Sequence, residues 1–120
     1  MTTLYIAGPM SGLPHYNYPA FNRAEEELLV AGYTVLNPVD AEKDNPTPGQ
    51  AQPWDWYMRK ALAMVLAADG IAVLDGWECS RGARLEVDVA HSLRMPVLPL
   101  RRWVEAGRPA KAIGRSEVTA

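Results

Sequence analysis

One carboxylate in the sequence stands among small apolar residues at helical spacing. Glu86 shares the face of an expected helix with Ala83 and Ala90, three residues before it and four after it. Burying an ionised carboxylate there without partners would cost several kcal/mol. That cost favours a positioned nucleophile or base, with the alanines leaving room for a ligand. The alternative is a boundary residue that reaches solvent or pairs with Arg84 or Arg59.

Two glycine-containing segments are candidates for binding an anion. Ser80, Arg81 and Gly82 begin the helix of Glu86 and offer a hydroxyl, a guanidinium and free backbone N–H groups. A plain serine cap beside a solvated arginine is the alternative. The second segment follows an expected strand and comprises Gly8, Pro9, Met10, Ser11 and Gly12. Its glycines suit a tight turn as well as a phosphate, because the full dinucleotide-binding motif and the P-loop lysine are both missing.

Aromatic and acidic side chains near the expected strand ends complete the set of candidates. The Tyr5 hydroxyl lies close enough to a strand end to hydrogen-bond a catalytic carboxylate or a sugar, although core packing also explains it. Trp54, Trp56 and Trp77 can stack on a nucleobase, or can belong to the core or to a subunit interface. Asp75 follows the third expected strand, at the same rim.

Metal and thiol chemistry have little support in the sequence. His15 and His91 have no second ligand at a useful spacing, so we expect neither a metal nor another cofactor. Cys79 is the single cysteine and has no histidine or asparagine partner that would indicate a thiol enzyme.

The pattern of apolar residues predicts alternating strands and helices. The expected strands are 3–7, 33–36, 70–74 and 96–98, and the expected helices are 20–31, 54–67 and 81–93. Residues 37–53 show no period and hold four prolines, which predicts a long loop. Alternation of this kind predicts an α/β domain of three layers with a parallel sheet of four to five strands. Ligands of such sheets bind at the carboxyl ends of the strands, where the candidate residues lie.

Length and charge limit the class of protein. The 120 residues suit one domain, which we expect over residues 1–100, with a basic extension over 101–120 that packs on it or trails from it. A net charge of -2 argues against a nucleic-acid polymer as partner. No apolar run approaches the ~20 residues of a membrane helix, and no secretory signal is recognisable, so we expect a cytoplasmic protein without a membrane partner.

Several segments taken together resemble a known superfamily. These are Tyr5–Pro9, Ala68–Ile71, Gly82–Glu86 with Ala90, and Pro96–Val97. Over roughly residues 3–100 the chain resembles the nucleoside 2-deoxyribosyltransferase-like superfamily, most of all a small branch of uncharacterised phage and bacterial proteins. The resemblance implies a flavodoxin-like (Rossmann-like) fold, N-glycosidic bond chemistry and a homodimer or larger assembly. It also implies that Glu86 attacks the anomeric carbon and that Tyr5 holds Glu86.

The resemblance also bears on the substrate. Ser80 matches a serine that binds the 5'-phosphate in nucleoside monophosphate hydrolases, where the transferases have an aspartate. An acid on the second helix that protonates the leaving base is replaced here by Ala61. Such proton transfer is typically worth about 10² to 10⁴ in rate. Either Asp40, Asp55 or Asp75 substitutes, or the base leaves easily as nicotinamide does from NAD, or the protein binds without turnover.

These observations lead to two functional hypotheses. The first is a hydrolase or deoxyribosyltransferase acting on a nucleoside 5'-monophosphate or related nucleotide, with Glu86 and Tyr5 catalytic. The second is a nucleotide-binding or interaction protein with the same cleft and little catalysis. The expected substrate-binding residues are Gly8, Pro9, Met10, Ser11, Gly12, Asp75, Trp77, Ser80, Arg81 and Gly82.

Overall fold

A parallel sheet with β1 near its centre organises the protein. The computed structural model describes residues 1–107. Its strands are β1 (Thr3–Ala7), β2 (Thr34–Leu36), β3 (Gly70–Val73) and β4 (Val97–Pro99). They are arranged in the order β2-β1-β3-β4 with every pair parallel, which confirms the predicted α/β sheet. The chain leaves β1 toward β2 on one side and later returns to β3 on the other, so a ligand-binding crevice is expected at the carboxyl end of β1.

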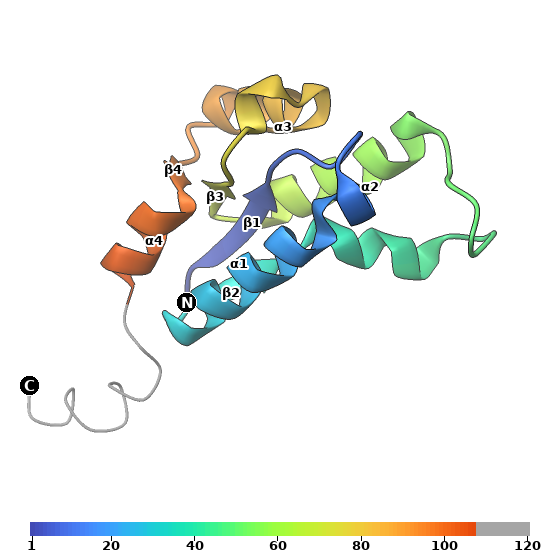
Figure 1. Cartoon of the computed structure of the whole chain (residues 1–120). Helices are drawn as coiled ribbons and strands as arrows, with labels where there is room; N and C mark the ends of the chain where they lie inside the picture. The colour runs from blue at the N-terminus through green and yellow to red at the C-terminus, as the bar shows by residue number, and fades with distance from the viewer. Residues whose placement is uncertain (108–120) are drawn as a thin grey trace, which may run out of the picture.

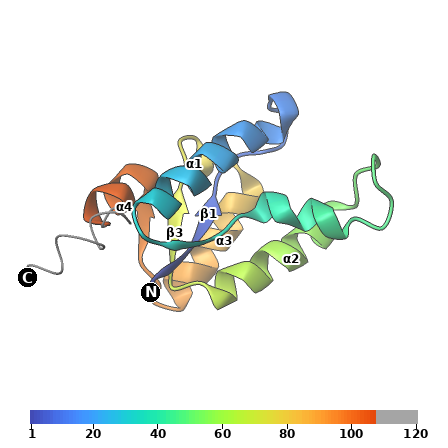
Figure 2. The ribbon, with the colours of Figure 1, turned by 90° about the horizontal axis from the view of Figure 1, so that it is seen from below.

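Two pairs of helices cover the two faces of the sheet (Figures 1 and 2). The helices are α1 (Tyr18–Val30), α2 (Trp54–Ala67), α3 (Arg81–Ser92) and α4 (Leu100–Ala106). Successive residues of β1 point to opposite faces, as strand geometry requires. Leu4 and Ile6 pack with α1 and α4, whereas Tyr5 and Ala7 pack with α2 and α3.

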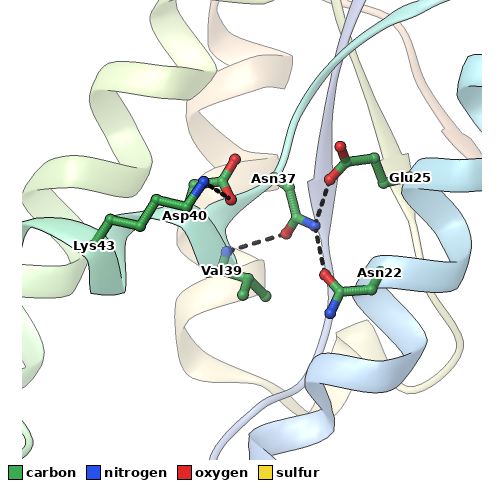
Figure 3. Close-up of polar contacts among 6 residues, drawn as sticks. All are labelled: Asn22, Glu25, Asn37, Val39, Asp40 and Lys43. Atoms are coloured by element: carbon green, nitrogen blue, oxygen red, sulfur yellow. Dashed lines mark hydrogen bonds and ion pairs between the residues drawn. The ribbon is translucent and has the colours of Figure 1, made fainter.

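The segment that the sequence predicts to be a loop contains a 3-10 helix, η2 (Pro38–Asp44). Asn37, only 2% exposed, caps η2 by accepting a hydrogen bond from the Val39 N–H at 3.0 Å. Its Nδ2 donates to Glu25 Oε1 at 2.9 Å and to Asn22 Oδ1 at 3.1 Å, both on α1 (Figure 3). The amide therefore fixes the start of η2 against α1. A helix of this kind is too short to leave a hydrophobic period in the sequence.

The start of the expected basic extension is also ordered. Residues 100–106 form α4, which packs against α1. Trp103 Nε1 donates to the Ile71 carbonyl at 2.8 Å, and the Tyr33 hydroxyl donates to the Trp103 carbonyl at 2.6 Å. These contacts fasten α4 to the sheet. The rest of the extension, residues 108–120, lies outside the described residues.

We predict that Asn37→Ala lowers the free energy of unfolding by about 1–3 kcal/mol, because the half-buried Val39 N–H loses its acceptor and α1 loses two hydrogen bonds to Asn37. Urea unfolding would measure the change. The control is Asp40→Ala, since the Asp40–Lys43 ion pair of the same helix is exposed and its loss should cost less than about 0.5 kcal/mol (Figure 3). Equal losses in the two variants would contradict a clamping role for Asn37.

Candidate functional site

A cavity of about 900 Å³ opens at the carboxyl end of β1, on the face covered by α2 and α3. The loop after β1, η2, the segment before α2 and the start of α3 all contribute to its walls. Within residues 1–107, a second cavity of about 500 Å³ lies on the opposite face, between α1 and α4. The larger cavity is where the sheet topology predicts a ligand.

Glu86 and Tyr5 meet in the wall of this larger cavity. Glu86 lies in the second turn of α3 and is only 6% exposed. The Tyr5 hydroxyl donates a hydrogen bond to Glu86 Oε2 at 2.7 Å. Ala83 and Ala90, on the same face of α3, are buried and add little volume beside the carboxylate. The two expected catalytic side chains are therefore in direct contact, although they are 81 positions apart in the sequence.

The environment of Glu86 favours its neutral form. Burial raises the pKa of Glu86 to about 7, and the hydrogen bond from Tyr5 acts in the opposite direction by stabilising the carboxylate. Burial, followed by the nearby Glu86 charge and its hydrogen bond, raises the pKa of Tyr5 well above its ordinary value. Tyr5 thus remains a donor at neutral pH, close to the pKa of Glu86.

Neither arginine considered as a partner neutralises Glu86. The Arg84 guanidinium donates to the Glu78 carbonyl at 3.0 Å. The ion pairs found among residues 1–107 are Lys43–Asp40 and Lys60–Asp44. Glu86 is thus a buried carboxylate held by a neutral donor, which is an arrangement typical of functional carboxylates.

The start of α3 lines the cavity with Ser80, Arg81 and Gly82. The Ser80 hydroxyl caps the helix, because its Oγ accepts from the Ala83 N–H at 3.1 Å. The Arg81 guanidinium lies 3.9 Å from the centre of the Trp54 ring, a cation–π contact that fixes its charge at the cavity. A Cβ atom at Gly82 would come within 3.1 Å of Met58 Sδ, so α3 packs closely on α2 at this glycine and a larger residue would require Met58 to shift.

The loop after β1 forms the next part of the wall. Gly8, Pro9, Met10 and Ser11 line the cavity. A Cβ atom at Gly8 would lie 2.9 Å from Leu74 Cβ, so glycine is required for the loop to pass the end of β3. Asn17 Nδ2 donates to the Pro9 carbonyl at 2.9 Å and holds the loop from the other side.

Three expected substrate-binding residues lie elsewhere. Asp75 lines the smaller cavity on the opposite face of the sheet. Trp77 packs, partly buried, against the core residues beneath α2 and α3. Gly12 is exposed, has a φ of +81° and is not among the residues that line the larger cavity. The turn after β3 therefore contributes Ser80 and Arg81 to the larger cavity but neither Asp75 nor Trp77.

Aromatic rings form an apolar wall that the sequence indicates only in part. Tyr16, Tyr18, Phe21, Trp54 and Tyr57 all line the cavity. Of these, only Trp54 is singled out by its place at the start of a predicted helix. Tyr16 reaches the wall from a turn in which His15, Tyr16 and Asn17 have positive φ values of 52°, 52° and 60°, a conformation that helical and strand patterns do not indicate.

A family model described as "Domain of unknown function (DUF4406)" matches residues 2–99. The chain belongs to the DUF4406 family. DUF4406 is a family of the nucleoside 2-deoxyribosyltransferase-like superfamily, which confirms the resemblance that the sequence motifs indicate. The fold is similar to that of a 2-deoxyribosyltransferase from the psychrotolerant bacterium Bacillus psychrosaccharolyticus, with 22% identity, a TM-score of 0.61 and coverage of 80% of this chain and 70% of that one. No curated protein matches the sequence.

The acid that the superfamily pattern implies on α2 has no counterpart at Ala61. Ala61 is 5% exposed and lines the cavity, so the missing side chain leaves open space there. Asp40 and Asp55 are exposed and, like Asp75, do not line this cavity. Glu42 of η2 does, and among residues 1–107 the carboxylates of the wall are Glu42 and Glu86. The sequence offers no signal for Glu42, because residues 37–53 lack a period that would place it.

Two further findings concern the described part of the chain. No helix within residues 1–107 is long and apolar enough to cross a bilayer. No three His, Cys, Asp or Glu side chains of that part come together as ligands for a metal ion. The cytoplasmic location and the homodimer expected from the sequence stay predictions.

We predict that Tyr5→Phe raises the pKa of Glu86 above about 7. The Tyr5 hydroxyl stabilises the ionised carboxylate by its hydrogen bond, and the variant lacks that bond. Titration of the Glu86 carboxyl carbon by NMR would measure the shift. Tyr33→Phe is the matched control, since the Tyr33 hydroxyl donates to a backbone carbonyl far from Glu86. An unchanged or lower pKa in Tyr5→Phe would contradict the role assigned to this hydroxyl.

Proposed function

We propose that the protein cleaves the N-glycosidic bond of a nucleoside 5'-monophosphate or related nucleotide, by hydrolysis or by transfer to a second base. The observation that carries the proposal is the Glu86 carboxylate, which is buried, faces a cavity of about 900 Å³ and is held by the Tyr5 hydroxyl at 2.7 Å. Burial without a cationic partner keeps a carboxylate poorly solvated and thus reactive toward an electrophilic carbon.

Glu86 is the nucleophile in the proposed reaction. Tyr5 donates to Oε2, so Oε1 is the oxygen available to attack the anomeric carbon. The new C–O bond forms as the C–N bond breaks, and the electron pair of the broken bond leaves with the base. Water or a second base then attacks the anomeric carbon of the glycosyl ester, and the ester C–O bond breaks to release the Glu86 carboxylate. The proton that the attacking water or base loses balances the one that the departed base takes up, which completes the double displacement of retaining glycosidases.

The start of α3 supports a phosphate on the sugar. Ser80, Arg81 and Gly82 provide one fixed positive charge, a glycine that allows close approach and the N-terminal end of a helix dipole. An acid at Ser80 would repel a 5'-phosphate there, whereas a serine does not. We therefore assign the phosphate to this end of the cavity and the base to the aromatic wall.

A binding protein with little catalysis is the second candidate function. The observation that favours it is Ala61, which leaves no acid on α2 to protonate the departing base. In that case the cavity would hold a nucleotide without breaking it. Incubation with NAD tests whether the protein cleaves only substrates with a good leaving group, because nicotinamide departs as a neutral base and needs no acid.

Incubation with deoxynucleotides, ribonucleotides, the matching nucleosides and NAD, followed by chromatography for free base, tests the proposal. We expect base release from at least one monophosphate, slower release from its nucleoside, and a loss of about 10³-fold or more in Glu86→Gln. Adding a second base shows whether transfer competes with hydrolysis. Glu26→Gln, an exposed change on α1, is the control and should leave release intact.

One result would overturn the proposed mechanism, and another would overturn the proposed function. Base release that survives Glu86→Gln would remove Glu86 as the nucleophile. Tight nucleotide binding without release from any substrate would establish the binding protein instead.

A further inference from the structure

Glu42 is a cavity carboxylate that the proposed reaction does not use. It lies on η2, is half-buried and lines the same cavity as Glu86. On α2, Tyr57 and Ala61 are four residues apart and both line the cavity, so they share a face of that helix. Because Glu42 is hydrogen-bonded to Tyr57, its carboxylate is held at the wall where the side chain of Ala61 leaves open space.

A hydrogen-bond network fixes the orientation of Glu42. The Tyr57 hydroxyl donates to Glu42 Oε1 at 3.0 Å, and Asn45 Nδ2 donates to Oε2 at 2.6 Å. Asn45 is only 6% exposed, and its Oδ1 accepts from Gln52 Nε2 at 2.8 Å and from the Thr47 N–H at 2.8 Å. The Gln52 N–H in turn donates to the Tyr57 hydroxyl at 3.2 Å. Each carboxylate oxygen of Glu42 therefore accepts a hydrogen bond from a side chain, Tyr57 or Asn45, that is oriented by further hydrogen bonds.

The carboxylate of Glu42 keeps unused acceptor capacity. Two oxygens offer about four acceptor sites, and the network occupies two of them. Both donors are neutral, and within residues 1–107 the lysines of this region pair with Asp40 and Asp44 instead. A carboxylate accepts hydrogen bonds and donates none, so it attracts an N–H group of a ligand and repels a carbonyl oxygen.

We infer that Glu42 is a specificity-determining residue that selects nucleobases with an exocyclic amino group over their keto counterparts. The inference rests on the proposed function, which places the base against the aromatic wall formed in part by Tyr18 and Tyr57. An amino group of adenine or cytosine donates to Glu42. The carbonyl oxygen of hypoxanthine or uracil at the same place faces a negative charge without a donor. A binding site whose polar group is left without a hydrogen-bond partner by the wrong ligand discriminates strongly against that ligand.

Nucleotide binding in a protein without turnover tests the inference. The parent is full-length Glu86→Gln, and calorimetry gives the Kd of dAMP against dIMP and of dCMP against dUMP. We expect the parent to bind the amino member of at least one pair more tightly by tenfold or more. Adding Glu42→Gln should reduce that ratio at least tenfold, because a glutamine amide can donate to a keto oxygen as well as accept from an amino group.

Glu25→Gln is the matched control. Glu25 also accepts a hydrogen bond from the η2 region, through Asn37 Nδ2, but does not line the cavity. The same Glu→Gln change there should leave the amino-to-keto ratio unaltered. Tyr57→Phe removes the donor that orients Glu42 Oε1 and should lower the ratio in the same direction, which provides a second test if Glu42→Gln does not fold.

The outcomes separate the inference from the function on which it rests. A ratio that falls with Glu42→Gln and persists with Glu25→Gln supports the inference. Three results would overturn the inference: the parent binds both members of each pair equally, the ratio is unaffected by Glu42→Gln, or Glu25→Gln lowers the ratio to the same extent. In each of these cases, nucleotide binding by the parent still supports the proposed nucleotide site. Binding of no nucleotide by either the parent or the unaltered protein overturns the proposed function and the inference with it.

Discussion

Tyr5 and Glu86 bring together a central strand and a helix that begins after the third strand, through one hydrogen bond of 2.7 Å in the core. Removing a carboxylate from water is costly, and a single neutral donor offsets only part of that cost, as the pKa of about 7 for Glu86 reflects. The bond requires both partners to be placed firmly. Tyr5 is placed because β1 pairs on both sides, with Leu36 and Ile71 as its neighbours in register.

The cavity beside this pair exists because the surrounding positions are small. Ala61 and Ala83 leave space on α2 and α3. Gly8 lets the loop after β1 pass Leu74 where a side chain would collide, and Gly82 lets α3 pack closely against Met58. Groups of different charge line that space: Arg81 at the start of α3, and Glu42 on η2. A molecule with an anionic group, a reactive carbon and a flat donor-bearing group matches this distribution, and a nucleotide has all three.

The sequence predicts those parts of the site that follow a regular period or a cap. The helical spacing around Glu86 and the strand that carries Tyr5 can both be recognised, and so can the serine cap of α3, which the Ser80–Ala83 contact confirms. Glu42 could not be predicted, because η2 is positioned by the side chain of Asn37 and not by a hydrophobic period. The sequence places residues 101–106 in a basic extension and does not predict α4, because what fastens this helix is a pair of hydrogen bonds through Trp103 to Ile71 and Tyr33, which are distant in the sequence.

Direct detection of a sugar on Glu86 tests the central claim most sharply. The protein would be incubated with a 2-deoxy-2-fluoro nucleoside 5'-monophosphate, whose fluorine slows breakdown of a glycosyl ester, and then analysed by intact-mass and peptide mass spectrometry. We expect a mass increase of one fluorinated sugar phosphate, located on the peptide that contains Glu86. Base release without such an adduct, or an adduct on another residue, would contradict it.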